Sequence, residues 1–184
     1  MRSPWRTLAA LALTALSGCC CAGGGPLEPT PYCPKTEAEA ALFSAARRDV
    51  FPDDIRENLK AHEAETVLWA GILRKVEIEG RTVILSIEHH YFDWVEDRGD
   101  GLAALSPHGE GTYECLLELM SAEDAENYRA RPPPPGRMMI TYGVPAGLTS
   151  TGVVRLRCRR LVSFKEGRFS TELLDYGREG PPVP

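Results

Sequence analysis

The chain has 184 residues, a formal net charge of −5 and 43% hydrophobic residues. This length suits one domain with appendages, and the hydrophobic content is too high for a disordered chain. The acidic balance argues against a general affinity for nucleic acid or for anionic lipid.

The first eighteen residues have the layout of a secretory signal peptide. Arg2 and Arg6 supply positive charge, an apolar run follows over residues 7–16, and small residues come next. The run is too short to cross a bilayer, which needs ~20 apolar residues. We therefore predict that residues 1–18 are removed, which takes away two positive charges and changes the formal charge from −5 to −7.

The end of this segment carries a second signal. The sequence Leu16-Ser17-Gly18-Cys19 resembles the bacterial lipobox, in which a leucine and small residues precede an obligatory cysteine. The resemblance implies cleavage before Cys19, a diacylglyceryl group on its thiol and a further acyl chain such as palmitate on the new amine, which together hold a protein stably to a membrane. The alternatives are an ordinary signal peptide with incidental cysteines, or a buried N-terminal helix. Cys20, rather than an aspartate, comes next, which by analogy with enteric bacteria favours the outer membrane.

Between this anchor and the body of the chain we predict two segments. Residues 19–35 are rich in glycine and proline and are predicted to be a lipidated flexible tether. Residues 36–65 are predicted to be a helical lead-in. Thr36 and Glu39 have the spacing of a capping box before an alanine-rich stretch, which predicts a helix to about Arg48, and Pro52 predicts the start of a second helix.

Residues 66–176 are predicted to form one β-rich domain, followed by a disordered tail at 177–184. Six runs of apolar and β-branched residues predict strands at 66–78, 81–94, 112–120, 137–144, 153–164 and, less clearly, 168–174. Several glycines and one proline predict a long loop over residues 97–111. Ser121 is predicted to cap a short helix that ends near Arg131, before four prolines.

This order of elements predicts the fold class. Five short strands with one short helix between the third and the fourth are typical of an OB-like Greek-key barrel. We therefore predict a mainly β fold, a small barrel of this kind with N-terminal helices, whose closure removes exposed strand edges. A β-sandwich with peripheral helices is the alternative, because periodicity alone does not separate the two.

Three segments of the β domain carry a family resemblance. They are residues 67–72 (VLWAGI), residues 81–85 (RTVIL), and Tyr128 with residues 135–137 (PGR) and 140–143 (ITYG). They resemble the strands of the Slp-like, starvation-inducible family of outer-membrane lipoproteins, although Ala70 replaces one glycine of that family's pair. The resemblance implies an outer-membrane lipoprotein and supplies no catalytic residues.

One cluster in the sequence suggests a metal site. Glu88, His89 and His90 are followed by Asp93. Adjacent residues of a strand point to opposite faces, and His89 and Asp93 would lie ~13 Å apart along an extended strand. We therefore predict no metal and no cofactor, and an enzyme that uses His89 and His90 is the lowest-ranked alternative.

A second cluster suggests an anionic ligand. Arg155, Arg157 and Arg159 alternate along the predicted strand 153–164, which places three guanidinium groups on one face. An anionic envelope glycolipid, or an acidic patch of a partner, could bind there. The alternative, which we favour, is a solvated face whose arginines pair across strands with Glu114 and Glu118.

Two cysteines fall on predicted inward faces. Cys115 and Cys158 lie on the predicted third and fifth strands, which are neighbours in an OB barrel, so they form either a disulfide or a pair of buried thiols. The cysteine spacings match no Cys-x-x-Cys metal pattern.

The sequence as a whole favours a non-enzymatic lipoprotein of the bacterial cell envelope, anchored by lipid on Cys19, whose barrel binds an envelope protein or has a structural role. The alternative is a lipoprotein that recognises an anionic envelope molecule on the three arginines. We expect no nucleic-acid partner.

Overall fold

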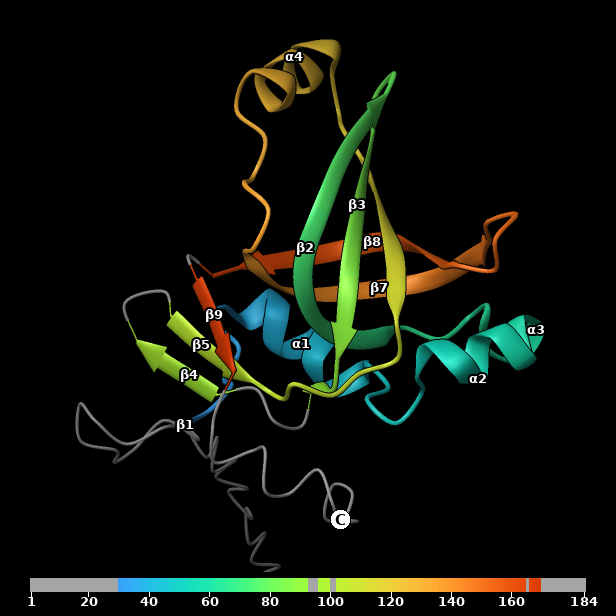
Figure 1. The fold of residues 1–184 in the computed structure, drawn as a ribbon, viewed down its shortest axis with the longest axis vertical. Helices are drawn as coiled ribbons and strands as arrows, with labels where there is room; N and C mark the ends of the chain where they lie inside the picture. The colour runs from blue at the N-terminus through green and yellow to red at the C-terminus, as the bar shows by residue number, and fades with distance from the viewer. Residues whose placement is uncertain (1–29, 93–95, 100–101, 165, 170–184) are drawn as a thin grey trace, which may run out of the picture.

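The computed structural model describes residues 30–92, 96–99, 102–164 and 166–169. The predicted signal peptide, Cys19 and the predicted tail lie outside these residues. Within them the chain forms a closed five-stranded barrel, a smaller four-stranded sheet and four short helices (Figure 1). The helices are α1 (Glu37–Ala45), α2 (Pro52–Glu57), α3 (Leu59–His62) and α4 (Ala122–Ala130). The strands are β1 (Thr30–Pro31), β2 (Val67–Glu79), β3 (Thr82–His90), β4 (Glu96–Gly99), β5 (Leu102–Leu105), β6 (Thr112–Glu118), β7 (Met138–Leu148), β8 (Val154–Ser163) and β9 (Glu166–Phe169).

The barrel has the strand order β2-β3-β6-β8-β7, and β7 returns to pair with β2. All neighbours are antiparallel except β6 and β8, which are parallel. The helix α4 lies in the connection between the third and fourth barrel strands. This order is that of an OB-type Greek-key barrel, so the predicted fold class is confirmed and the β-sandwich alternative is wrong.

The inside of the barrel is filled by side chains that alternate along each strand. We call this set the interior cluster. Trp69, Leu73, Leu85 and Tyr113 are among its largest members, and each is at most 1% exposed. The Trp69 indole donates to the Val50 carbonyl at 2.7 Å, which satisfies its one polar atom. A small barrel filled in this way is a packed core and not a channel.

A second core, the outer cluster, covers the outside of β2 and β7. Ala70 and Tyr142 belong to it, and α1 contributes Leu42 and Phe43. The first seven residues of β2 are therefore buried on both faces. This double burial explains why the sequence there is a continuous apolar run and not an alternating one.

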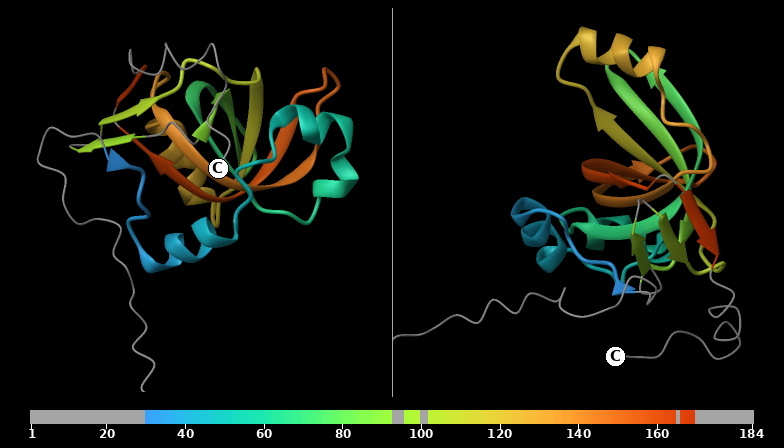
Figure 2. Two further views of the ribbon diagram at one scale, coloured as in Figure 1. Left: turned by 90° about the horizontal axis from the view of Figure 1, so that it is seen from below. Right: turned by 90° about the vertical axis from the view of Figure 1, so that its left-hand side faces the viewer.

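The smaller sheet corrects the predicted long loop over residues 97–111. This stretch contains β5 and most of β4, and the sheet has the order β1-β4-β5-β9. Its edge strands come from residues 30–31, inside the predicted tether, and from residues 166–169. The predicted sixth strand thus pairs with β5 in parallel, and its positions 170–174 lie outside the described residues. Figure 2 shows this sheet and α1 at one end of the barrel and α4 at the other.

The helix α1 ends three residues before the predicted Arg48. The chain leaves the helix because the Arg47 amide donates to the Thr66 carbonyl at 2.7 Å, which starts a bridge to β2. Thr36 caps the helix as predicted, accepting from the Glu39 amide at 3.2 Å. The Glu39 carboxylate, however, accepts from the Lys35 amide at 3.0 Å and turns into the outer cluster.

The Glu39 carboxylate is fully buried between α1 and the barrel. It accepts hydrogen bonds from the hydroxyls of Tyr32 and Tyr142, the second at 3.1 Å, and Arg160 of β8 lies 3.6 Å away. Burial and the neighbouring carboxylate raise the pKa of both tyrosines, so both stay protonated donors. The hydrogen bonds of the Glu39 carboxylate therefore hold α1 against the outside of the barrel.

Candidate functional site

The two histidines of the candidate metal cluster, for which we predicted no metal, lie on opposite sides of β3. The His89 ring packs against Trp69 and Tyr113, with ring centroids 5.5 Å and 6.3 Å away. His90 instead bonds the Ser106 carbonyl through Nδ1 at 2.7 Å. Within the described part of the chain, no three histidine, cysteine or acidic side chains are grouped to hold a metal ion. Asp93 lies outside the described residues.

His89 acts as a neutral hydrogen-bond acceptor. Burial, with smaller contributions from His90 and Arg56, lowers its pKa to about 3. Its Nδ1 accepts the Glu110 amide at 3.1 Å, which holds the segment that leads into β6. Gly109 sits so close to this strand that a Cβ there would lie 1.8 Å from the His89 carbonyl oxygen. His89 therefore has a structural role: it holds the segment around Gly109 and Glu110 against β3.

The arginines of β8 do not form one uniform face. Arg155 donates to Glu114 of β6 at 2.8 Å, which is the cross-strand pair that the sequence suggested. Glu118 instead accepts from the Thr82 hydroxyl at 2.9 Å. Arg157 and Arg159 are exposed, and neither forms an ion pair with another described residue.

A break in the register of β8 interrupts the expected alternation. Gly143 of β7 pairs with Cys158, and Tyr142 pairs with Arg160, so Arg159 has no partner on β7. Such a bulge re-aims the side chains that follow it. Here it turns Arg160 toward the buried Glu39, at 3.6 Å. The four arginines of β8 therefore have different roles: Arg155 pairs with Glu114, Arg157 and Arg159 are exposed, and Arg160 faces the buried Glu39.

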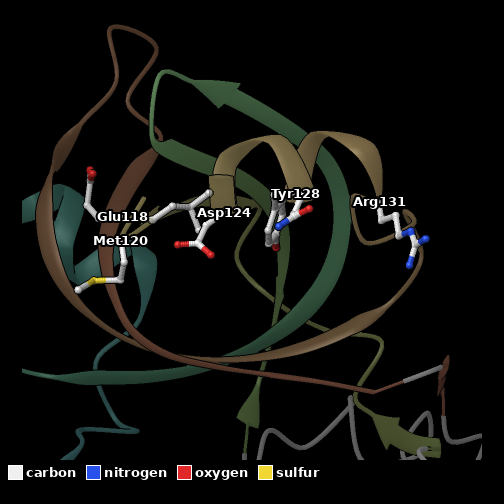
Figure 3. Close-up of a pocket in the computed structure, with 7 residues that line it drawn as sticks. Glu118, Met120, Asp124, Tyr128 and Arg131 are labelled. Atoms are coloured by element: carbon white, nitrogen blue, oxygen red, sulfur yellow. The ribbon is translucent and has the colours of Figure 1, made fainter. Parts of the chain in front are cut away.

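The structure also contains a groove that the sequence did not predict. Two adjoining hollows, of about 470 and 450 Å³, lie beside α4 and share Tyr128 and Arg131. We call them together the α4 groove. Figure 3 shows α4 crossing one end of the barrel, with Tyr128 pointing from the helix toward the barrel. The further lining residues are Glu118, Leu119, Met120, Asp124 and Asn127 on one side, and Pro132, Pro133, Pro134, Arg137, Met139, Leu161 and Ser163 on the other.

Local contacts explain how α4 reaches this position. Ser121 and Asp124 cap its first turn reciprocally, with 3.0 Å between each amide and the partner side chain. Arg129 donates to the Gly80 carbonyl at 3.0 Å, which ties the helix to the turn between β2 and β3. Ala125 is the one buried residue of α4, and Tyr128 is partly buried. The helix therefore covers the barrel end with few anchoring side chains.

The two cysteines predicted to face inward do lie together. Cys115 and Cys158 are free thiols at the β6–β8 seam, and both pack in the interior cluster. Cys115 is fully buried, whereas Cys158 is partly buried. A hydrogen bond between the two thiols, with burial, raises the pKa of Cys115.

The class of protein that this strand order defines is an OB-type barrel. No family model and no curated protein matches the chain. Among solved structures it is similar to a chain in the S. pombe Stn1–Ten1 complex, with 14% identity and a TM-score of 0.34 over 55% of this chain and 59% of that one. It is also similar to the OBody AM1L10 bound to hen egg-white lysozyme, with 14% identity and a TM-score of 0.38 over 64% of this chain and 92% of that one.

Proposed function

We propose that the protein is a lipid-anchored, non-enzymatic component of the bacterial cell envelope, whose barrel binds a partner through its outer surface. The observation that carries the proposal is the sequence of residues 16–19, a lipobox directly after a signal-peptide layout. The resemblance of the β domain to Slp-like outer-membrane lipoproteins agrees with it and stays a prediction.

The arrangement of the described part is compatible with a short tether. Thr30 of β1 follows Cys19 by eleven positions, a length that spans at most ~40 Å when fully extended. β1 lies in the small sheet, at the end of the molecule away from α4 (Figure 1). An anchor at Cys19 would therefore hold the small sheet nearer the membrane and leave the α4 groove on the far side. No helix among the described residues is long and apolar enough to cross a membrane.

The way the barrel is filled supports binding on its outer surface. Trp69 and Tyr113 close the interior with their rings, 4.9 Å apart between centroids, so a ligand has no room inside. Met120, in the α4 groove, is the most exposed large apolar side chain of the described residues, at 90%. A partner therefore meets the groove or the strand faces, not the core.

The lipid anchor is tested by metabolic labelling of the full-length chain in a bacterial host. Cells receive a clickable palmitate analogue, and membranes are washed with high salt. We expect label and membrane retention for the unaltered chain, and loss of both for Cys19→Ser. Cys20→Ser is the matched control, because it removes a neighbouring thiol outside the lipobox and should keep label and retention.

Mass spectrometry of the mature N-terminal peptide completes this test. We expect a peptide that begins at Cys19 and carries acyl chains. A Cys19→Ser chain that is cleaved at the same bond and remains as firmly membrane-bound would contradict the proposal. Crosslinking in intact cells then identifies the partner, and failure of any protein to crosslink above the level of an unrelated lipoprotein would contradict the binding role.

Arg157 and Arg159 support a second candidate function, recognition of an anionic envelope glycolipid. Both guanidinium groups are exposed and free of ion pairs with other described residues, whereas Arg155 is held by Glu114. The test is binding to vesicles that contain lipopolysaccharide. Replacing Arg157 and Arg159 with alanine should weaken binding at least about tenfold and reduce its salt dependence, while Arg155→Ala should change it little. Equal binding of all three proteins would eliminate this candidate.

A further inference from the structure

The barrel seam holds two thiols on neighbouring strands. Cys115 of β6 lies opposite Leu156 of β8 in the parallel register, and Cys158 comes two positions later on β8. Residues two positions apart share a face of a strand, so Cys158 points into the barrel as Leu156 does. Cys115 belongs to the interior cluster and Cys158 packs against it, and the two thiols lie within hydrogen-bond reach of each other.

The two thiols differ in exposure and in acidity. Cys115 is fully buried, and Cys158 is only partly buried. The hydrogen bond from Cys115 favours the thiolate of Cys158 and lowers its pKa, although burial opposes this effect. The same hydrogen bond, followed by burial, raises the pKa of Cys115. In thiol–disulfide exchange the attacking group is the more accessible thiolate, which here is Cys158.

Tyr128 connects this pair with the α4 groove. Tyr128 packs against the interior cluster that contains Cys115, as Cys158 does. Burial first, and then the charges of the two cysteines, raise the pKa of the Tyr128 hydroxyl. Tyr128 also lines both hollows of the groove (Figure 3). The helix α4 completely buries only Ala125, so few buried side chains hold it over this part of the barrel.

We propose that Cys115 and Cys158 form a reversible disulfide that links β6 to β8, made by exchange with an external disulfide. The Cys158 thiolate attacks one sulfur of the external disulfide, which forms a mixed disulfide and releases one thiolate. Cys115 then gives up its proton and attacks the Cys158 sulfur, which releases the second thiol. Two protein thiols are oxidised and one external disulfide is reduced. This proposal is independent of the lipid anchor, since any oxidising disulfide can drive the exchange.

The test uses the full-length protein in detergent, equilibrated with glutathione buffers of increasing oxidised fraction. Free thiols are blocked with an alkylating reagent, and proteolytic peptides are identified by mass spectrometry. We expect a linked peptide that contains Cys115 and Cys158 to appear as the buffer becomes more oxidising, and to disappear on reduction. In the reduced protein we expect Cys158 to be alkylated at least about tenfold faster than Cys115.

Single substitutions separate the roles of the two thiols. Cys115→Ala should accumulate one glutathione on Cys158, because the resolving thiol is missing, whereas Cys158→Ala should accumulate none on Cys115. Cys33→Ala is the matched control, since Cys33 is outside the interior cluster, and it should form the Cys115–Cys158 link as the unaltered chain does. Absence of the linked peptide from the folded, unaltered protein in fully oxidising buffer would overturn the proposal. So would equal alkylation rates at the two thiols.

Discussion

The stability of this protein should fall in acid because His89 is buried without charge. The folded state holds the His89 pKa at about 3, against an ordinary value of 6.5. Between pH 6.5 and pH 3 this histidine is protonated in the unfolded chain and neutral in the folded chain. The free energy of unfolding therefore decreases as the pH falls toward 3. Each pH unit within this window is worth at most about 1.4 kcal/mol, so roughly 3 kcal/mol is lost by about pH 4.

The assay is urea unfolding of the unaltered protein and of His89→Phe between about pH 7 and pH 4. Phenylalanine keeps an aromatic ring beside Trp69 and removes the titration, but it leaves the Glu110 amide without its acceptor. The variant should therefore be less stable near pH 7 by about 1–3 kcal/mol. The difference in stability should disappear or reverse near pH 4, because only the unaltered protein loses stability through His89. The effects of His90 and the carboxylates are present in both proteins and cancel in the comparison. If the free energy of unfolding fell equally with pH in the unaltered protein and in His89→Phe, the reasoning would be refuted.

Substitutions at three further positions test the packing and the charges. Glu39→Ala should lower the free energy of unfolding by about 3–5 kcal/mol, and Glu39→Gln by clearly less because its amide oxygen still accepts hydrogen bonds; equal losses in urea unfolding would contradict this. Gly109→Ala should lower it by about 3 kcal/mol, since the new Cβ meets the His89 carbonyl at 1.8 Å, and an unchanged melting temperature would show that the segment can move aside. Arg155→Ala should lower it by less than about 1 kcal/mol, because the Arg155 side chain is 41% exposed where it pairs with Glu114; a larger loss in the same assay would show that the ion pair is shielded from water.

The barrel could be predicted from the sequence because its signals are local. The Glu79-Gly80 turn separates two apolar runs, and Gly80 adopts a φ of 61°, which glycine tolerates best. Ser121 marks the start of the helix between the third and fourth barrel strands. Together with the strand count these signals were enough for the strand order, and that order placed Cys115 and Cys158 on adjacent strands.

The small sheet could not be predicted because its strands depend on distant partners. β4 and β5 are short, and each is held by a strand from near one end of the chain: β4 by residues 30–31 and β5 by residues 166–169. The composition of residues 97–111 is that of a loop, and local propensity contains no information about such pairing.

The candidate sites show the same division between local and tertiary signals. The Arg-x-Arg-x-Arg pattern predicts a regular face, but the bulge at Arg159 depends on the register with β7 and is hidden in the sequence. Tyr128 lines the α4 groove because Arg129 bonds the Gly80 carbonyl, a contact across 49 positions. Glu39 has the spacing of a capping box, and only the tertiary position of two tyrosines explains why it turns inward.

The pairing of β2 with β7 has a consequence for how the chain folds. Val67 lies opposite Gly143, so the barrel closes only when segments about 75 positions apart have met. Contacts between such distant segments slow folding, because the chain loses much entropy before they form. A nascent chain would remain open until its last barrel strands have been synthesised. During that interval Cys115 and Cys158 are not yet enclosed in the interior cluster, so both thiols are accessible to an external disulfide.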